Sequence, residues 1–314
     1  MKIHVVVNGR AGTVLDWDSD SLGEQIVSAF RNEGHEVTVH IVPPDELPQT
    51  VRSVVEAGCD ALIVGGGDGT VRTAATALVG TNVPLGILPL GTLNRLARDL
   101  KIPLTVPEAA AALARGQGAA SDVGEVNGRI FLNNSILGLT VVYSQYRQSV
   151  RGKPFTERMR GYASAIKEIL VNRRRMDVDI DHGQAKMRLR ILSMAVSNNR
   201  YQERASLMMT KESLDGGELA VYVSQHPSGW GLVRGVVRAM LGRVKSDPNV
   251  IHFAAHEMDV SAKRSRLRLA NDGELEIVEM PLRYSIRPGA LKVLVPATET
   301  KLDAERTDET VLIR

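Results

Sequence analysis

The stretch Val64-Gly65-Gly66-Gly67-Asp68-Gly69-Thr70 joins a short apolar run to an alanine-rich segment. The run before it, Asp60–Val64, is typical of a buried parallel strand, and the segment after it, Val71–Val79, contains good helix formers and no breaker. A glycine turn between a strand and a helix directs backbone N–H groups and a helix N-terminus at an anion. The stretch therefore predicts a phosphate-binding loop, although an Asp-Gly tight turn without any ligand would look the same locally.

Side chains and glycines of this loop are candidates for contacts with a phosphate or a metal. Gly66, Gly67 and Gly69 lack a Cβ, so the backbone can approach a phosphate closely. Asp68 could hold magnesium, directly or through water, or accept a proton, and Thr70 supplies a hydroxyl and a helix cap. The loop lacks the lysine of a Walker A motif, and Thr70 occupies the third glycine position of a dinucleotide fingerprint.

A second unit of strand, turn and helix follows the first. Val83–Leu88 predicts a strand, and the turn after it contains Gly91, Thr92 and Asn94 before a helical segment. In an open α/β sheet both turns lie at the carboxyl edge of the strands, which is where ligands bind. The two turns therefore predict one shared binding site, in which Thr70, Thr92 and Asn94 could add side-chain hydrogen bonds to a bound phosphate.

Composition limits the class of protein. A chain of 314 residues suits two domains, its 43% hydrophobic content allows a full core, and its net charge of +3 gives no indication of nucleic-acid binding. The single cysteine, Cys59, excludes an internal disulfide and fits a reducing compartment. No apolar run approaches the roughly 20 residues that cross a bilayer, and Met1–Val7 predicts a first strand rather than a signal sequence. We expect a cytoplasmic protein, with peripheral association at the inner membrane face left open.

The N-terminal third alternates between strand and helix patterns. Strands are expected at Ile3–Val7 and Glu36–Val42, and helices at Leu22–Arg31 and Val51–Ala57. Together with the two glycine turns, this alternation predicts an open parallel sheet with helices on both faces. We assign residues 1–120 to this α/β domain, with a hinge at Gly116-Gln117-Gly118.

Beyond residue 120 the pattern changes to short alternating runs separated by turns. Asn127-Gly128 is a strong hairpin signal. We therefore predict a β-rich, mainly antiparallel domain over residues 121–297; a return of the later chain to the first domain is left open. The expected strands are Ile130–Asn133, Met176–Ile180, Met187–Val196, Leu219–Val223, His256–Val260, Leu267–Ala270, Leu275–Met280 and Leu291–Val295.

The two glycine turns together resemble a known family. G-G-D-G-T at Gly66–Thr70 followed by P-L-G-T-x-N at Pro89–Asn94 is similar to the catalytic domain of diacylglycerol kinases and their sphingosine kinase relatives. The first element alone is shared more widely, with NAD kinases and phosphofructokinases. Asn271-Asp272-Gly273-Glu274 and the closing run Pro288–Pro296 resemble the D-G-E turn and last strand of the lipid kinases.

This resemblance implies ATP-dependent, magnesium-assisted phosphoryl transfer to the hydroxyl of diacylglycerol or a similar lipid alcohol, with the nucleotide between two domains. It implies that Asp272 is the general base, with Asp68 as the alternative base, and that Glu274 assists positioning or contacts the nucleotide. Asn8 matches the first loop of the family and would join the nucleotide site.

Five positions depart from the family pattern. Gly9 stands where proline is usual, Arg72 and Thr73 where many relatives have asparagine and glutamate, Arg95 where many have aspartate, and Gly216 where the pattern has a second aspartate, near a structural cation in some relatives. Two alternatives stay open. The shared G-G-D-G-T element allows a kinase of a small soluble alcohol, similar to NAD kinase, and the departures at Arg72 and Arg95 allow a non-catalytic relative that binds nucleotide or lipid.

Two segments combine apolar and basic residues at helical spacing, namely Thr156–Arg175 and Trp230–Lys245. A basic amphipathic helix with a tryptophan can lie in the headgroup zone of an anionic membrane. A surface helix packed on its own domain has the same pattern. The sequence leaves this choice open, and it does not indicate an oligomeric state.

Overall fold

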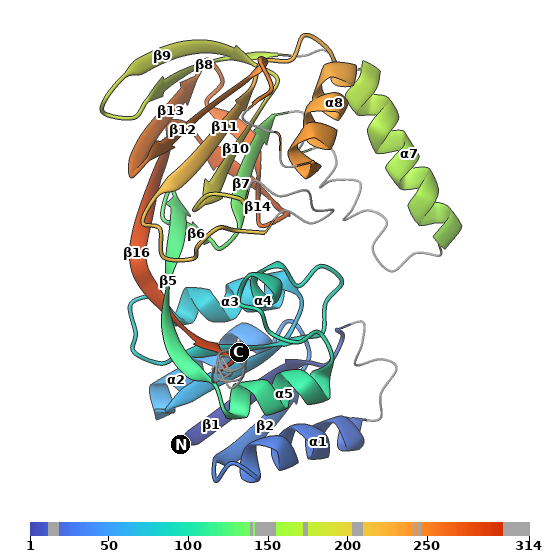
Figure 1. Ribbon diagram of the computed structural model, residues 1–314, viewed down its shortest axis with the longest axis vertical. Helices are drawn as coiled ribbons and strands as arrows, with labels where there is room; N and C mark the ends of the chain where they lie inside the picture. The colour runs from blue at the N-terminus through green and yellow to red at the C-terminus, as the bar shows by residue number, and fades with distance from the viewer. Residues whose placement is uncertain are drawn as a thin grey trace, which may run out of the picture.

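The computed structural model describes residues 1–11, 19–138, 141, 155–171, 175–202, 210–241, 243 and 246–297. These residues form an α/β region and a β-rich region, which two long strands join (Figure 1). The arrangement confirms the predicted fold class. No helix in these ranges is long and apolar enough to cross a membrane. The chain after residue 297 lies outside the described residues.

The N-terminal region is built on four parallel strands in the order β2-β1-β3-β4. Every residue of β3 is buried, which explains why its sequence is a continuous run of apolar residues and glycine rather than an alternating one. The bounds of these strands are β1 (Lys2–Asn8), β2 (Glu36–Val42), β3 (Ala61–Gly66) and β4 (Leu85–Pro89).

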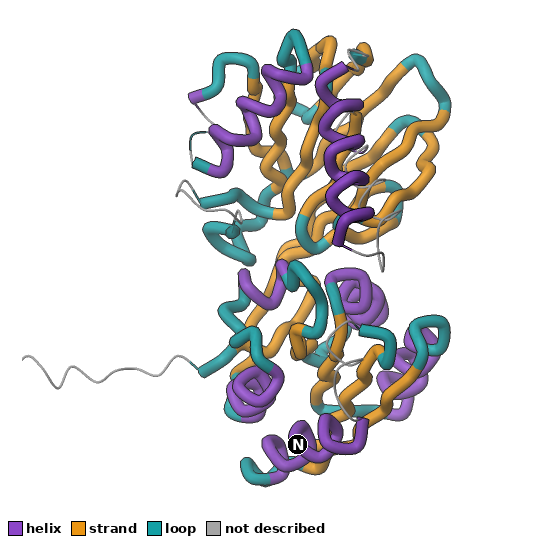
Figure 2. Tube along the Cα trace, turned by 90° about the vertical axis from the view of Figure 1, so that its right-hand side faces the viewer, coloured by secondary structure: helices purple, strands orange, loops and turns teal. Residues whose placement is uncertain are grey.

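Helices cover both faces of this sheet, as Figure 2 shows. Crossovers between parallel strands are right-handed, so the helix leading out to β2 lies on the opposite face from those leading back to β3 and β4. Accordingly α1 contacts α5, and α2 contacts α3. The helix α2 begins before the predicted Val51, with Pro48 in its first turn, where the missing N–H has no partner to lose. The bounds are α1 (Ser19–Arg31), α2 (Leu47–Ala57), α3 (Asp68–Leu78), α4 (Arg95–Asp99) and α5 (Val106–Ala114).

Two long antiparallel strands, β5 (Gln117–Val126) and β16 (Leu282–Val295), connect the regions. The end of β16 joins β4 in parallel, with Val293 opposite Leu85, whereas its beginning pairs with a strand of the β-rich region. In the stretch expected to be the hinge, residues 116–118, Gln117 and Gly118 are strand residues paired with Val295 and Leu294. The last strand is longer than predicted and buries its final residues in the N-terminal core.

The β-rich region packs two sheets against each other. The sheet that continues from the N-terminal region ends in β16-β13-β8-β9, with β5 beside β16 and β6 beside β5. The second sheet has the order β12-β11-β10-β7-β14-β15. The bounds are β6 (Arg129–Phe131), β7 (Asn134–Gly138), β8 (Met176–Asp181), β9 (Lys186–Ile191), β10 (Ser193–Asn198), β11 (Leu219–Ser224), β12 (Val250–Ala255), β13 (Glu257–Ala262), β14 (Arg266–Asn271) and β15 (Glu274–Glu279).

The sequence predictions for this region are mostly confirmed, with two differences. Asn127 and Gly128 both have positive φ and form the expected tight turn between β5 and β6. The single strand expected at Met187–Val196 is in fact β9 and β10, because the chain changes sheet at the buried Leu192. β7 and β12 had no prediction. The helices α7 (Phe155–Val171) and α8 (Gly229–Met240) contact each other outside the sheets (Figure 1).

Candidate functional site

The first glycine turn lies between β3 and α3. The helix begins at Asp68 with Gly67 as its N-cap, so the expectation that Thr70 caps the helix is wrong. Thr70 lies in the first turn instead, where its Oγ1 accepts a hydrogen bond of 3.2 Å from Nδ2 of Asn8. A Cβ on Gly66 would meet the Thr70 side chain at 2.5 Å, so only glycine fits there. N–H groups of a first helical turn have no partner within the helix, so this turn presents donors toward the second loop.

The two glycine turns are in direct contact, as the sequence predicted for a shared edge. A Cβ placed on Gly91 would overlap the Cα of Gly67 and lie 2.8 Å from Oδ1 of Asn94. The loops are also joined by Asp68, whose Oδ1 accepts the backbone N–H of Arg95 at 2.7 Å. Glycine at position 91 is therefore required by the approach of the two backbones.

Asn94 shapes the second turn. It adopts a left-handed conformation with φ of 47°, and its Oδ1 accepts the N–H of Gly91 at 2.9 Å. Its Nδ2 donates to the carbonyls of Gly91 at 2.7 Å and Pro89 at 3.3 Å. The buried amide thus holds the loop in place, while Thr92 is exposed beside it.

The turn that contains Asp272 faces the first turn of α3. Asp272 and Gly273 have positive φ and form the hairpin between β14 and β15. A Cβ on Gly69 would lie 3.6 Å from Oε1 of Glu274, which places that carboxylate beside the glycine loop. The structure therefore brings the acidic hairpin and both glycine turns to one place, although they lie far apart in the sequence.

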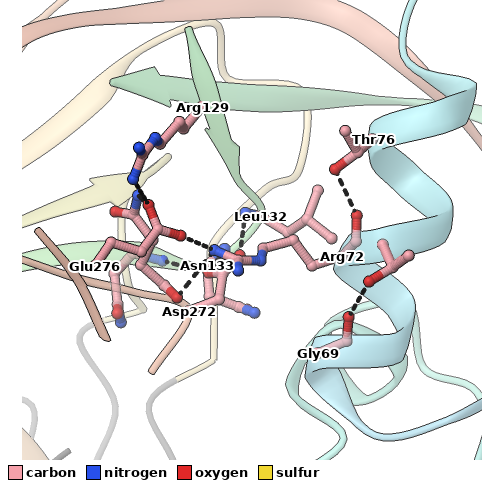
Figure 3. A network of polar contacts seen from close by, with 11 residues as sticks. Gly69, Arg72, Thr76, Arg129, Leu132, Asn133, Asp272 and Glu276 are labelled. Carbon is pink, nitrogen blue, oxygen red and sulfur yellow. Dashed lines mark hydrogen bonds and ion pairs between the residues drawn. The ribbon is translucent and has the colours of Figure 1, made fainter. Parts of the chain in front are cut away.

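The Asp272 carboxylate is held by three backbone N–H groups at the end of β6. Oδ2 accepts from Leu132 at 2.8 Å, and Oδ1 accepts from Asn133 at 2.7 Å and Asn134 at 3.1 Å (Figure 3). Burial raises the pKa of Asp272, although these hydrogen bonds and the nearby Arg72 guanidinium oppose the shift. The carboxylate is thus fixed in orientation and remains a stronger base than an exposed aspartate.

The sequence did not predict Lys211, which contacts the same backbone segment that binds the Asp272 carboxylate. Its buried Nζ donates to the carbonyl of Leu132 at 2.5 Å, and the backbone N–H of Lys211 donates to Oδ1 of Asp99 at 3.2 Å. Burial lowers the pKa of Lys211 to about 8, although the carboxylates of Asp99, Asp272 and Asp122 oppose this. No local pattern marks this lysine, because its partners come from other parts of the chain.

The structure leaves little room for a side chain at Gly216. A Cβ at that position would lie 2.9 Å from Oδ1 of Asn199, and Nδ2 of Asn199 donates to the buried Asp122 at 3.1 Å. Asp122 also accepts the N–H groups of Gly217 at 2.6 Å and Gly289 at 2.8 Å. In the described part of the chain, no three His, Cys, Asp or Glu side chains cluster as metal ligands.

The two arginine departures have different environments. Arg95 is exposed, and its backbone rather than its side chain contacts Asp68. Arg72 extends from α3 to β15, where Nη1 donates to Oε1 of Glu276 at 2.8 Å (Figure 3). The charge of Arg72 is thus balanced by Glu276, a residue that the sequence analysis did not predict as its partner.

Comparison with known proteins agrees with this geometry. The family model "Diacylglycerol kinase catalytic domain" matches residues 2–126, and the model "YegS C-terminal NAD kinase beta sandwich-like domain" matches residues 142–295. A Pseudomonas aeruginosa protein named "Probable lipid kinase YegS-like" is 29% identical over 279 residues, covering 86% of this chain and 88% of that protein. A protein of the same name from Pseudomonas fluorescens is 28% identical over 312 residues, with 95% and 99% covered.

Solved structures share the fold. The crystal structure of a diacylglycerol kinase from Bacillus anthracis matches with a TM-score of 0.70 and 17% identity, covering 95% of this chain and 97% of that one. This match shows the fold. The two family models, whose matches include both glycine turns and the Asp272 hairpin, identify the family. The chain belongs to the diacylglycerol kinase catalytic-domain family of lipid kinases.

Proposed function

We propose that this protein transfers the γ-phosphoryl group of ATP to the hydroxyl of diacylglycerol or a similar lipid alcohol. One observation carries the proposal. The two glycine turns touch at Gly67 and Gly91, and the Asp272 hairpin lies beside them at the N-terminus of α3. Phosphoryl transfer passes through a loose transition state and depends mainly on positioning and charge stabilisation. A phosphate-binding helix terminus facing a partly buried carboxylate provides both.

In this proposal the nucleotide phosphates bind the backbone of the two glycine turns. Gly66, Gly67, Gly69 and Gly91 allow the close approach, and the first turn of α3 supplies N–H donors. The hydroxyls of Thr70 and Thr92 would add hydrogen bonds, while Asn8 orients Thr70 and Asn94 maintains the second turn. Glu274, whose Oε1 lies beside Gly69, is proposed to assist positioning or to contact the nucleotide.

Asp68 fits a magnesium ion that arrives with ATP. Mg²⁺ in kinases is held by one or two carboxylates together with phosphate oxygens and water, rather than by a cage of protein ligands. The Oδ1 of Asp68 accepts the Arg95 N–H, so Oδ2 is the oxygen proposed to reach the metal directly or through water. When bound, the ion would neutralise charge on the phosphates. The absence of a three-ligand cluster in the described ranges agrees with a site of this kind.

Asp272 is the proposed general base. Its Oδ1 accepts two N–H groups and its Oδ2 accepts one, so Oδ2 retains a lone pair for the proton of the acceptor hydroxyl. The pKa of Asp272, raised by burial, strengthens this role. Asp68 remains the alternative base, since it lies in the glycine turn beside the proposed phosphate site.

We expect the protein to phosphorylate a lipid. Incubation with labelled ATP, Mg²⁺ and a panel containing diacylglycerol, sphingosine, a total lipid extract and NAD should place the label in extracted lipid. Label on NAD would instead favour a kinase of a soluble alcohol. Binding of ATP without turnover on any acceptor would favour a non-catalytic relative.

The helix α8 is the proposed membrane contact. Trp230, Val237 and Leu241 are exposed large apolar side chains on or just after this helix. Arg234 and Arg243 are exposed close by, so apolar and positive groups occur together. This combination suits the headgroup region of an anionic bilayer.

We expect the protein to sediment with vesicles that contain anionic phosphatidylglycerol more than with neutral phosphatidylcholine vesicles, and less as salt rises. The double variant Arg234→Gln/Arg243→Gln should weaken this binding, because each basic residue near an anionic surface contributes about 1 kcal/mol. The matched control is Arg188→Gln/Arg190→Gln, which removes the same charge from the exposed face of β9. Equal loss in both variants, or indifference to lipid charge, would contradict a membrane role for α8.

A further inference from the structure

A shared ion pair links the Asp272 hairpin to the helix of the glycine loop. Arg72 lies on α3, and its Nη1 donates to Oε1 of Glu276 at 2.8 Å and to the carbonyl of Asn271 at 3.4 Å. On the other side of Glu276, Oε2 accepts from Nη1 of Arg129 at 2.8 Å and from Nδ2 of Asn271 at 3.4 Å (Figure 3). The Glu276 carboxylate is thus bound on both oxygens by groups from three separate elements.

The environment of this network distinguishes it from an ordinary surface pair. The side chains of Arg72 and Glu276 are 22% and 16% exposed, whereas Arg129 is 51% exposed. Burial would raise the pKa of Glu276, but the hydrogen bonds from Arg129 and Arg72 hold it below its usual value. The carboxylate is therefore ionised in the network, and the partly buried pair is screened less by solvent than an exposed one.

The position of Arg72 relates the network to the proposed chemistry. The helix that carries it begins at the glycine loop, and Asn271, which it contacts, immediately precedes Asp272. Residues about two hundred positions apart are therefore joined by one guanidinium. A planar guanidinium fixes direction as well as distance, which an ammonium group does not.

We propose that Arg72 is a positioning residue, which ties the Asp272 turn to the glycine-loop helix and so sets the base relative to the phosphates of ATP. The inference rests on the proposed function, because it concerns that same site. It also explains the departure from the family pattern at this position: the arginine on α3 is matched by Glu276 on β15.

The variant Arg72→Gln tests this role. We expect kcat for the lipid acceptor to fall by about 10- to 100-fold, since a displacement of about 1 Å in a reacting group can cost 10²-fold. The dissociation constant for ATP should change less than about threefold, because the glycine turns bind the phosphates through their own backbone. Arg72→Lys should restore little, because the shorter lysine side chain ends in an ammonium group that does not fix the direction of its hydrogen bonds.

The pH profile gives a readout that general destabilisation would not produce. The Arg72 charge favours the ionised form of Asp272, so its removal should move the acid limb of kcat/KM to higher pH. The charged groups facing this carboxylate include Arg72 and Lys211, and only the first is changed. Glu276→Gln in the Arg72→Gln background should add little further loss, because the pair acts as one unit.

The matched control is Arg266→Gln, on the same hairpin. Arg266 donates to Oε1 of Glu279 at 2.8 Å, but both side chains are largely exposed and the pair does not reach α3. Wild-type kcat and an unmoved pH profile in Arg72→Gln, or equal losses in Arg266→Gln, would overturn the proposal.

Hydrogen exchange separates this inference from the proposed function. In Arg72→Gln the amides of Leu132, Asn133 and Asn134, which bind Asp272, should exchange about tenfold faster, while Arg266→Gln leaves them unchanged. If the wild type phosphorylates no acceptor, the proposed function fails on its own. Unchanged exchange in Arg72→Gln would overturn the positioning role regardless of that outcome.

Discussion

Replacing Asp272 by asparagine is expected to lower kcat with a lipid acceptor by about 10²–10⁴-fold, which is the usual contribution of a general base. The amide cannot accept a proton from the acceptor hydroxyl, while the glycine turns that bind ATP are untouched. The affinity for ATP, measured by equilibrium titration, should therefore remain close to that of the wild type. Steady-state assays on the same lipid panel give the comparison.

The substitution also has a predictable structural cost. The carboxylate accepts N–H groups on both oxygens, so an asparagine amide must direct its own NH₂ at Leu132 or at the Asn133 and Asn134 pair. A buried donor left unpaired costs about 1–3 kcal/mol, and thermal unfolding should show a loss of that size. Activity is best measured well below the transition, so that the loss of turnover is not a loss of folded protein.

The pH dependence of wild-type activity gives an independent test of Asp272 as the general base. A base must be ionised to act, so kcat/KM should fall as pH falls through the pKa of Asp272, which burial raises above its ordinary value. That limb should be missing from Asp272→Asn. Near-normal turnover in Asp272→Asn, combined with a large loss in Asp68→Asn, would transfer the role of base to Asp68.

Gly91→Ala should weaken ATP binding by at least about tenfold. The new Cβ would overlap the Cα of Gly67 and press on Oδ1 of Asn94. Because one neighbour is backbone, no rotamer change relieves the overlap, and the two turns must separate. Overpacking of this kind typically costs about 1–3 kcal/mol, and we expect the upper end of that range in thermal unfolding.

Two other glycines provide matched controls for Gly91. A Cβ on Gly67 would lie 3.4 Å from the Cα of Gly91, so Gly67→Ala should be milder than Gly91→Ala although it alters the same contact. Gly118 in β5 has no atom within 4 Å of its added Cβ, so Gly118→Ala should bind ATP like the wild type. Normal ATP affinity in Gly91→Ala would contradict the placement of the phosphates between the two turns.

The proposed site could be predicted from sequence only where its residues are local to one turn. The glycine loops could be identified because a loop that binds phosphate through its backbone needs glycine at fixed spacing. Asn94 was included for a contact with nucleotide, yet its amide is bound to its own loop. Lys211 and Asp99 were missed, because their contact joins positions 112 residues apart and leaves no local signal.

The sequence by itself determined the fold class, the order of most strands and helices, and the three turns of the proposed site, because periodicity and turn residues act over a few neighbouring positions. The tertiary structure alone decided how β16 returns to β4, where the chain changes sheet at Leu192, and which carboxylate balances Arg72. These features depend on strand pairing and on side chains that meet across the whole chain. Their energies arise only when distant segments are packed together.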